Sequence, residues 1–236
     1  MENKILNLIK KFFNLSVAIL IILLFIFVYK INNKESDSEY VTKLCRQSPI
    51  NINSNNISIK NSDILNLGFF NKNINARLVE TTKKDNISYL VDENVISYFN
   101  GHKYKLIQFH FHYPSEHKIN NKTYDMEVHF VNRSIEKKNE NLVIAFFLKK
   151  GTVGVFDSCL RLDNKVEIKL NDTNLENFFF YPGSLTTDPF SSNVTWIVFE
   201  NPIESSNINI WNKRLGKARK ISTNFFAGEV LKFNRK

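Results

Sequence analysis

Two short stretches of the chain carry histidines at a spacing that could bind a metal ion. His110 and His112 are separated by one residue, and His129 lies in a second apolar stretch. In a β-strand, side chains alternate between two faces, so His110 and His112 would share one face. If the two strands pair, His129 joins them. Three neutral imidazoles with a fourth position left open are the ligand set of a catalytic zinc site.

Two polar residues lie where they could support these histidines. Gln108 precedes His110 by two positions and Glu127 precedes His129 by two, so each shares a strand face with a histidine. A metal-bound histidine usually donates its second ring N–H to a carboxylate, an amide or a carbonyl. A lone histidine in an apolar strand is more often a hydrogen-bonded core residue. Three histidines with such neighbours favour a metal site.

Composition bounds the class of protein. The 236 residues are enough for one domain with a substantial core. The net charge is +9, with much of the basic excess near the two ends. Because no nucleic-acid-binding motif accompanies it, we interpret the excess as solvated surface and expect no nucleic-acid partner. The two cysteines, Cys45 and Cys159, are too few for a disulfide scaffold, and the sequence leaves open whether they pair.

The N-terminal segment predicts attachment to a membrane. Residues 1–11 are polar and basic, and residues 12–31 are nearly all apolar, enough to span a hydrocarbon core of roughly 30 Å. Positive charge before the apolar run favours a cytosolic N-terminus. We therefore expect an uncleaved signal anchor, a linker over residues 32–40, and a domain in the periplasm, the extracellular space or a secretory lumen. Cleavage of a signal peptide, which would release a secreted domain, is the alternative, although Tyr29–Lys34 contains no small-x-small cleavage site.

The rest of the chain, residues 41–236, has the rhythm of a β protein. Short alternating apolar runs are separated by polar turns such as Asn100-Gly-His102. The expected strands include Ala76–Val79, Ile87–Val91, Val95–Phe99, Tyr104–Leu106, Leu142–Leu148 and Thr195–Phe199. Val155–Leu162 predicts a short helix. We expect a mainly β single domain with a large, mostly antiparallel central sheet and short surface helices.

Six motifs resemble those of the α-class carbonic anhydrases and occur in that family's order. They are Gln47-Ser-Pro-Ile-Asn-Ile52, Leu106-Ile-Gln-Phe-His-Phe-His112, Ser115-Glu-His117, Glu127-Val-His129, Gly183-Ser-Leu-Thr-Thr187 and Val194-Thr-Trp-Ile-Val198. The resemblance runs from about Cys45 to the C-terminus. It implies a zinc enzyme, a lyase that interconverts carbon dioxide with bicarbonate and a proton.

The resemblance also implies roles for single residues. His110, His112 and His129 would bind Zn²⁺, with Gln108 and Glu127 holding the imidazoles. Thr186 and Glu116 would be catalytic, aiming a zinc-bound hydroxide at carbon dioxide. The pocket for this uncharged substrate would be formed by Val131, Val143, Leu185, Trp196 and Thr187.

The chain departs from the family pattern at three places. Near Val79–Lys84 there is no histidine, although fast members carry a proton-shuttling histidine in this region. Phe190 replaces a cysteine that is frequent in the family, so the usual disulfide is absent. Phe226 follows Asn224-Phe225 at a position where an arginine is often found.

Two other functions fit parts of the pattern. A cupin-type oxygenase or isomerase uses a His-x-His-x-x-x-Glu motif, here His110 to Glu116, with a later histidine, but Thr123 stands where its glycine is expected. A non-catalytic binding module at the cell surface is the second alternative. Against it, the chain keeps all three histidines together with Glu116 and Thr186.

Overall fold

The computed structural model describes residues 46–57, 59–62, 64–80, 87–152, 154–171, 176–206, 208, 218–222 and 230–235. The chain divides into two units, Met1–Leu44 and Cys45–Lys236, and all described residues belong to the second. No helix among these residues is long and apolar enough to cross a membrane. The membrane segment expected at residues 12–31 lies outside the described residues, as do Cys45 and Asn224-Phe225-Phe226.

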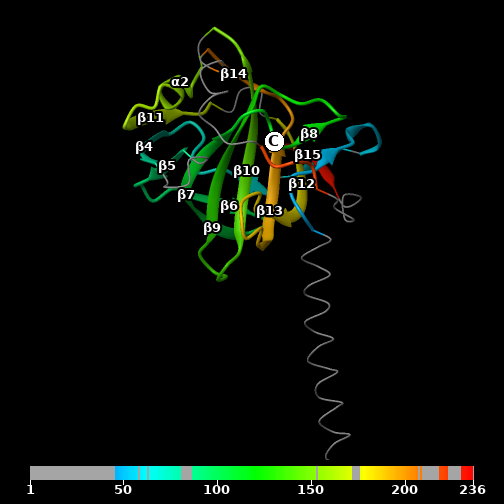
Figure 1. Ribbon diagram of the computed structural model, residues 1–236. Coiled ribbons are helices and arrows are strands. Elements are labelled where there is room, and N and C mark those ends of the chain that lie inside the picture. Colours follow the sequence, from blue (N-terminus) through cyan, green and yellow to red (C-terminus); the bar gives the residue numbers. More distant parts are fainter. Residues whose placement is uncertain are drawn as a thin grey trace, which may run out of the picture. The chain divides into compact units, whose positions relative to one another are not determined.

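A large mixed β-sheet dominates the described part of the chain (Figure 1). Its main path runs through β11 (Lys165–Lys169), β4 (Asn73–Glu80), β5 (Ile87–Val91), β7 (His102–His112), β9 (Met126–Ser134), β10 (Asn141–Lys150), β13 (Ser192–Phe199), β12 (Asn177–Ser184), β15 (Leu231–Arg235) and β2 (Ile59–Ser62). Most neighbouring strands are antiparallel, whereas β10–β13 and β15–β2 are parallel. The predicted mainly β fold with a mostly antiparallel sheet is therefore confirmed.

Several short elements complete the fold. They are β3 (Leu65–Asn66), β6 (Ile96–Phe99) and β14 (Ile203–Ser205) on the large sheet, the separate pair β1 (Asn51–Ile52) and β8 (Lys118–Ile119), the 3-10 helix η1 (Ser54–Asn56) and the helix α2 (Asp157–Leu160). The short helix predicted over Val155–Leu162 is thus confirmed as α2. Its Cys159 is buried and carries a free thiol.

The sheet buries apolar side chains on both faces. One face carries an aromatic core that includes Phe109, Phe111 and Phe130, which alternate along β7 and β9. The opposite face carries a second core around Trp196, to which Val143 and Tyr181 contribute. We call these the aromatic core and the Trp196 core. Because side chains alternate along a strand, the histidines between the phenylalanines must face the Trp196 core.

A β-bulge in β7 sets this arrangement. Before the bulge, Tyr104 and Leu106 point into the aromatic core, and after it Phe109 and Phe111 do. The register with β9 shifts between Leu106 and Gln108, so Ile107 is the extra residue. One extra residue reverses the alternation of a strand, and without it every later side chain would lie on the other face. The two runs expected on either side of Leu106 are one continuous strand in the structure.

The packing of the aromatic core predicts how much stability is lost when Phe130 is truncated. Phe130 is fully buried, and its ring stacks on Phe109 and Phe69 with centroids 5.1 and 4.9 Å away. Phe130→Ala should lower the free energy of unfolding by about 3–5 kcal/mol, because it leaves a cavity in a packed core. Urea denaturation followed by circular dichroism measures this loss. The control is Ile135→Ala, since Ile135 is 56% exposed and its truncation should stay within about 0.5 kcal/mol. Equal losses for both variants would contradict the described core.

Candidate metal centre

The two histidine-bearing strands pair as the sequence predicts. In the antiparallel register of β7 and β9, His110 lies directly opposite His129, and His112 lies opposite Glu127. The ring centroid of His112 lies 4.9 Å from that of His110 and 4.4 Å from that of His129. One ring nitrogen of each histidine lies within 4.8 Å of the other two. Three nitrogen donors from two strands therefore converge on one region of the sheet.

Hydrogen bonds determine which ring nitrogen of His110 and of His129 keeps a lone pair for a metal ion. The Gln108 Oε1 atom lies 3.0 Å from His110 Nδ1, and the Glu127 Oε1 atom lies 2.7 Å from His129 Nε2. Because both oxygens accept, these ring nitrogens carry the protons and donate them. The lone pairs on His110 Nε2 and His129 Nδ1 are then left for another partner. Gln108 and Glu127 thus lie where the sequence analysis expected supporting residues.

The environment of the His112 Nε2 atom shows whether this site fits a metal ion. Its Nε2 atom is buried and has no hydrogen-bond partner among the described residues. A buried polar atom without a partner is costly and requires an explanation. Metal coordination supplies one, because neutral imidazole nitrogen is a preferred zinc ligand. The donor set of three histidines therefore fits Zn²⁺.

Burial keeps the imidazoles of His110 and His112 neutral. It lowers the pKa of His110 to about 3, with the neighbouring His129 acting in the same direction. Burial also holds the pKa of His112 well below its ordinary value, again reinforced by His129. A histidine must be unprotonated to bind a metal. Both rings are therefore ready to bind at neutral pH.

Glu127 is the buried anion behind the centre. Its Oε2 atom accepts the backbone N–H groups of Glu116 at 2.9 Å and His117 at 2.8 Å. Its Oε1 atom accepts His129 Nε2 and His117 Nδ1, the latter at 2.6 Å. Burial acts to raise the pKa of Glu127, but the two histidines and their hydrogen bonds outweigh it and hold the pKa well below its ordinary value. Glu127 is therefore an ionised carboxylate that accepts four hydrogen bonds.

His117 extends this support away from the centre. Its ring is fully buried, with Nδ1 bonded to Glu127 and Nε2 to the Tyr181 hydroxyl, which in turn lies 2.9 Å from Ser48 Oγ. His117, Glu127 and His129 also lie close enough together to suggest a metal site. Their facing atoms are already engaged with one another, however, so this cluster supports the centre. The role of His117 was not predicted from the sequence, because this residue lies in the motif Ser115-Glu-His117, outside the two histidine-bearing strands.

Glu116 and Thr186 lie beside the centre. Glu116 Oε1 accepts the backbone N–H of Arg219 at 2.9 Å and lies 3.4 Å from His112 Nδ1. Burial raises the pKa of Glu116, while His129, the Thr186 hydroxyl and the Arg219 amide act to lower it. Thr186 is itself buried. The structure thus brings the two predicted catalytic residues together, and adds Arg219, which the sequence analysis did not single out.

The predicted substrate wall is contiguous. Val143 on β10 lies opposite Val131 on β9 and opposite Trp196 on β13, so the three form a row across adjacent strands. Leu185 packs against the same Trp196 core. The Trp196 and His129 rings are 4.8 Å apart between centroids. Thr187 is half-buried directly after Thr186. The apolar wall therefore borders the imidazole cluster.

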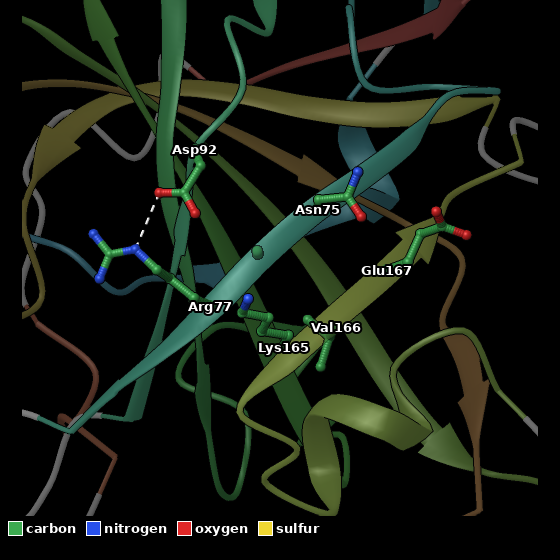
Figure 2. A pocket seen from close by; sticks show the side chains of 7 residues that line it. Asn75, Arg77, Asp92, Lys165, Val166 and Glu167 are labelled. Atoms are coloured by element: carbon green, nitrogen blue, oxygen red, sulfur yellow. Dashed lines mark hydrogen bonds and ion pairs between the residues drawn. The ribbon is translucent and has the colours of Figure 1, made fainter.

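A separate groove of about 420 Å³ lies over β4 and β11 and contains none of the predicted site residues (Figure 2). It is lined by Asn75, Ala76, Arg77, Asp92, Lys165, Val166 and Glu167. Arg77 Nε pairs with Asp92 Oδ1 at 3.1 Å, and both side chains are more than half exposed. Solvent-facing charges of both signs line the groove. The candidate centre is therefore identified by its three histidine nitrogens and by the burial of His112 and His129, and this groove plays no part in the identification.

Comparison with known proteins identifies the family. Residues 35–224 match the family model of the eukaryotic-type carbonic anhydrases. The chain belongs to this family. A carbonic anhydrase of Nostoc sp. is 38% identical over 117 residues, which are 44% of this chain and 44% of that protein. Carbonic anhydrase Nec1 of Nesocodon mauritianus is 31% identical over 190 residues, 70% of this chain and 64% of that protein. This carbonic anhydrase homologue thus spans less than two thirds of these relatives.

Solved structures agree with the family assignment. The α-carbonic anhydrase of Thermovibrio ammonificans, solved with the inhibitor sulfanilamide, has a TM-score of 0.66 and 26% sequence identity to this chain. The match covers 82% of this chain and 88% of that protein. The described sheet is therefore the carbonic anhydrase fold.

The support from Glu127 is testable through zinc affinity. Glu127→Gln replaces an acceptor-only oxygen with an NH₂ group that faces other donors, so it should weaken zinc binding about 10- to 100-fold. Competition with a chelator of known affinity at pH 7 measures the change. The matched control is Glu136→Gln, because Glu136 also bonds a histidine, His102 at 2.7 Å, but on the surface. Unchanged affinity in the Glu127 variant would contradict this role.

Proposed function

We propose that this carbonic anhydrase homologue catalyses the reversible hydration of carbon dioxide to bicarbonate and a proton, with Zn²⁺ at the candidate centre. One observation carries the proposal: three imidazoles converge, those of His112 and His129 are buried, and His112 Nε2 has no hydrogen-bond partner in the described part of the chain. Membership of the carbonic anhydrase family supports the reaction.

The three histidines would hold the metal through His110 Nε2, His112 Nε2 and His129 Nδ1. When bound, zinc supplies the acidity that lowers the pKa of a water ligand to about 7, as is known for carbonic anhydrase. Neutral ligands suit this chemistry, since anionic ligands would offset more of the metal's charge.

Thr186 and Glu116 would orient the attacking oxygen. An ionised Glu116 can only accept hydrogen bonds, so the Thr186 hydroxyl directs its proton to the carboxylate. The Thr186 oxygen is then left to accept the hydrogen of the attacking hydroxyl group. A lone pair of the attacking oxygen is thereby aimed toward the apolar wall.

The apolar wall would hold carbon dioxide. Val131, Val143 and Trp196 offer no hydrogen-bond donor to the site beyond the indole N–H, which is engaged with the Ser184 carbonyl at 2.9 Å. Such a surface suits an uncharged substrate better than a charged product. The wall thereby favours entry of carbon dioxide and departure of bicarbonate.

We also propose that residues 12–31 anchor the chain in a membrane with the catalytic domain outside the cytosol. The support is the sequence itself, since Phe12–Tyr29 contains no charged residue and follows a basic segment.

Zinc content and stopped-flow hydration rates of the purified protein test the proposal. His110→Ala should lose both zinc and activity. Thr186→Ala should keep zinc and lose about 100-fold in kcat/KM, because the attacking oxygen is no longer oriented. Thr195→Val is the control, since Thr195 alternates with Trp196 and points to the other face of β13. Iron or manganese in place of zinc would favour a cupin-type enzyme, and a zinc-loaded but inactive protein would favour a binding module.

Buffer dependence provides a second test. His117 is buried with both ring nitrogens engaged, and His102 pairs with Glu136 at the other end of β7, about 26 Å along the strand from His110. The chain's remaining histidines are the three proposed ligands. No histidine is therefore placed to carry protons from the centre to solvent. The hydration rate at fixed pH and ionic strength should rise with imidazole concentration, and a rate independent of imidazole would contradict this reading.

A further inference from the structure

The Arg219 side chain joins two segments that are distant in sequence. Its Nη2 atom donates to Gln47 Oε1 at 2.9 Å, and its Nη1 atom donates to the Ser48 carbonyl. Its guanidinium carbon lies 3.8 Å from the centre of the Phe190 ring. Arginine suits this arrangement because its planar fork donates along two edges while its face stacks on an aromatic ring. One half-buried side chain thus links the Gln47–Ser48 segment to the loop that ends at Phe190.

The Gln47–Ser48 segment is a firm anchor. Ser48 N–H donates to Ser184 Oγ at 3.0 Å, and Ser184 N–H donates back to Ser48 Oγ at 3.1 Å. Gly183 permits this approach, since a Cβ at that position would lie 2.2 Å from Ser48 Oγ. The Tyr181 hydroxyl adds a contact at 2.9 Å. Because these contacts do not involve Arg219, the segment can hold the arginine in place.

The loop, by contrast, is held by few bonds. We call Leu185–Ser191 the threonine loop because it carries Thr186. It is closed by Leu185 N–H to the Ser191 carbonyl at 2.9 Å and by Phe190 N–H to the Thr187 carbonyl at 2.8 Å. Phe190 has φ = 56°, a left-handed conformation that is unfavourable for a bulky residue and persists only where the surroundings impose it. The guanidinium over its ring is one such restraint.

Arg219 also touches the other half of the catalytic pair. Its backbone N–H donates to Glu116 Oε1 at 2.9 Å. A residue whose side chain binds the threonine loop therefore binds, through its main chain, the carboxylate that Thr186 approaches. Any displacement of the guanidinium would alter the position of Glu116 relative to Thr186.

We propose that the Arg219 guanidinium is a positioning residue, which clasps the threonine loop to the Gln47–Ser48 segment and so keeps Thr186 and Glu116 in register. This inference rests on the proposed function for its catalytic consequence, but the clasp itself is a statement about the loop.

Two variants of Arg219 test the clasp. Arg219→Met keeps the apolar stem and the backbone N–H but removes every side-chain donor. Arg219→Lys keeps the charge, yet a single ammonium cannot reproduce the fork. The control is Arg77→Met, which removes an exposed, ion-paired arginine from the groove in Figure 2. Each full-length protein is compared with wild type for hydrogen–deuterium exchange of peptides covering 185–191 and 126–134, for zinc affinity, and for kcat and KM.

For Arg219→Met we expect faster exchange in residues 185–191 alone, unchanged zinc affinity, and a kcat lowered about 10- to 100-fold with KM within about twofold of wild type. Arg219→Lys should lie between it and wild type, and Arg77→Met should match wild type. Millimolar guanidinium ion should restore part of the lost activity.

Three results would separate the alternatives. Wild-type exchange and kcat in both Arg219 variants would overturn the clasp. Faster exchange in both peptides together with weaker zinc binding would also overturn it, because Arg219 would then serve overall stability only. The third result combines two observations: the Arg219 variants show faster exchange in the threonine loop only, and the wild-type protein has no hydratase activity. This result would support the clasp and overturn the proposed function.

Discussion

The buried carboxylate of Glu127 is the interaction on which the centre depends. An ion without access to water is tolerable only when hydrogen bonds replace its hydration, and Glu127 receives four. Two come from the backbone before β8, one from His117 and one from His129. The same bonds that stabilise the anion therefore fix the tautomer of His129 and attach the Glu116–His117 segment to β9. Removing the charge would release all of these groups together.

Sheet geometry supplies the second constraint. The bulge at Ile107 places Phe109 and Phe111 in the aromatic core and turns His110 and His112 toward the Trp196 core. The candidate centre consequently lies between the packed aromatic core and the apolar wall. Side chains on paired strands are held more closely than side chains on loops, which is what a three-ligand site requires.

Local patterns in the sequence predict much of this arrangement, and the remainder has an identifiable cause. The alternation along β7 and β9 predicts which strand face each of His110, His112 and His129 occupies, because strand periodicity is a local property. That the three meet required the further assumption that the two strands pair, which the structure confirms. The roles of His117 and Arg219 could not be predicted in this way. Tyr181 lies 64 positions from His117, and Glu116 lies 103 positions from Arg219, so neither contact leaves a periodic signal. The order of β12, β15 and β2 likewise depends on pairings between the ends of the chain.

Phe190 stands where a cysteine is frequent in the family, and the guanidinium of Arg219 lies over its ring. A disulfide bond is reduced by thiols and formed by oxidants, whereas a cation–π contact is affected by neither. In this protein the geometry of the threonine loop is therefore insulated from the redox state of its surroundings. The position of this loop depends instead on non-covalent contacts of one arginine side chain.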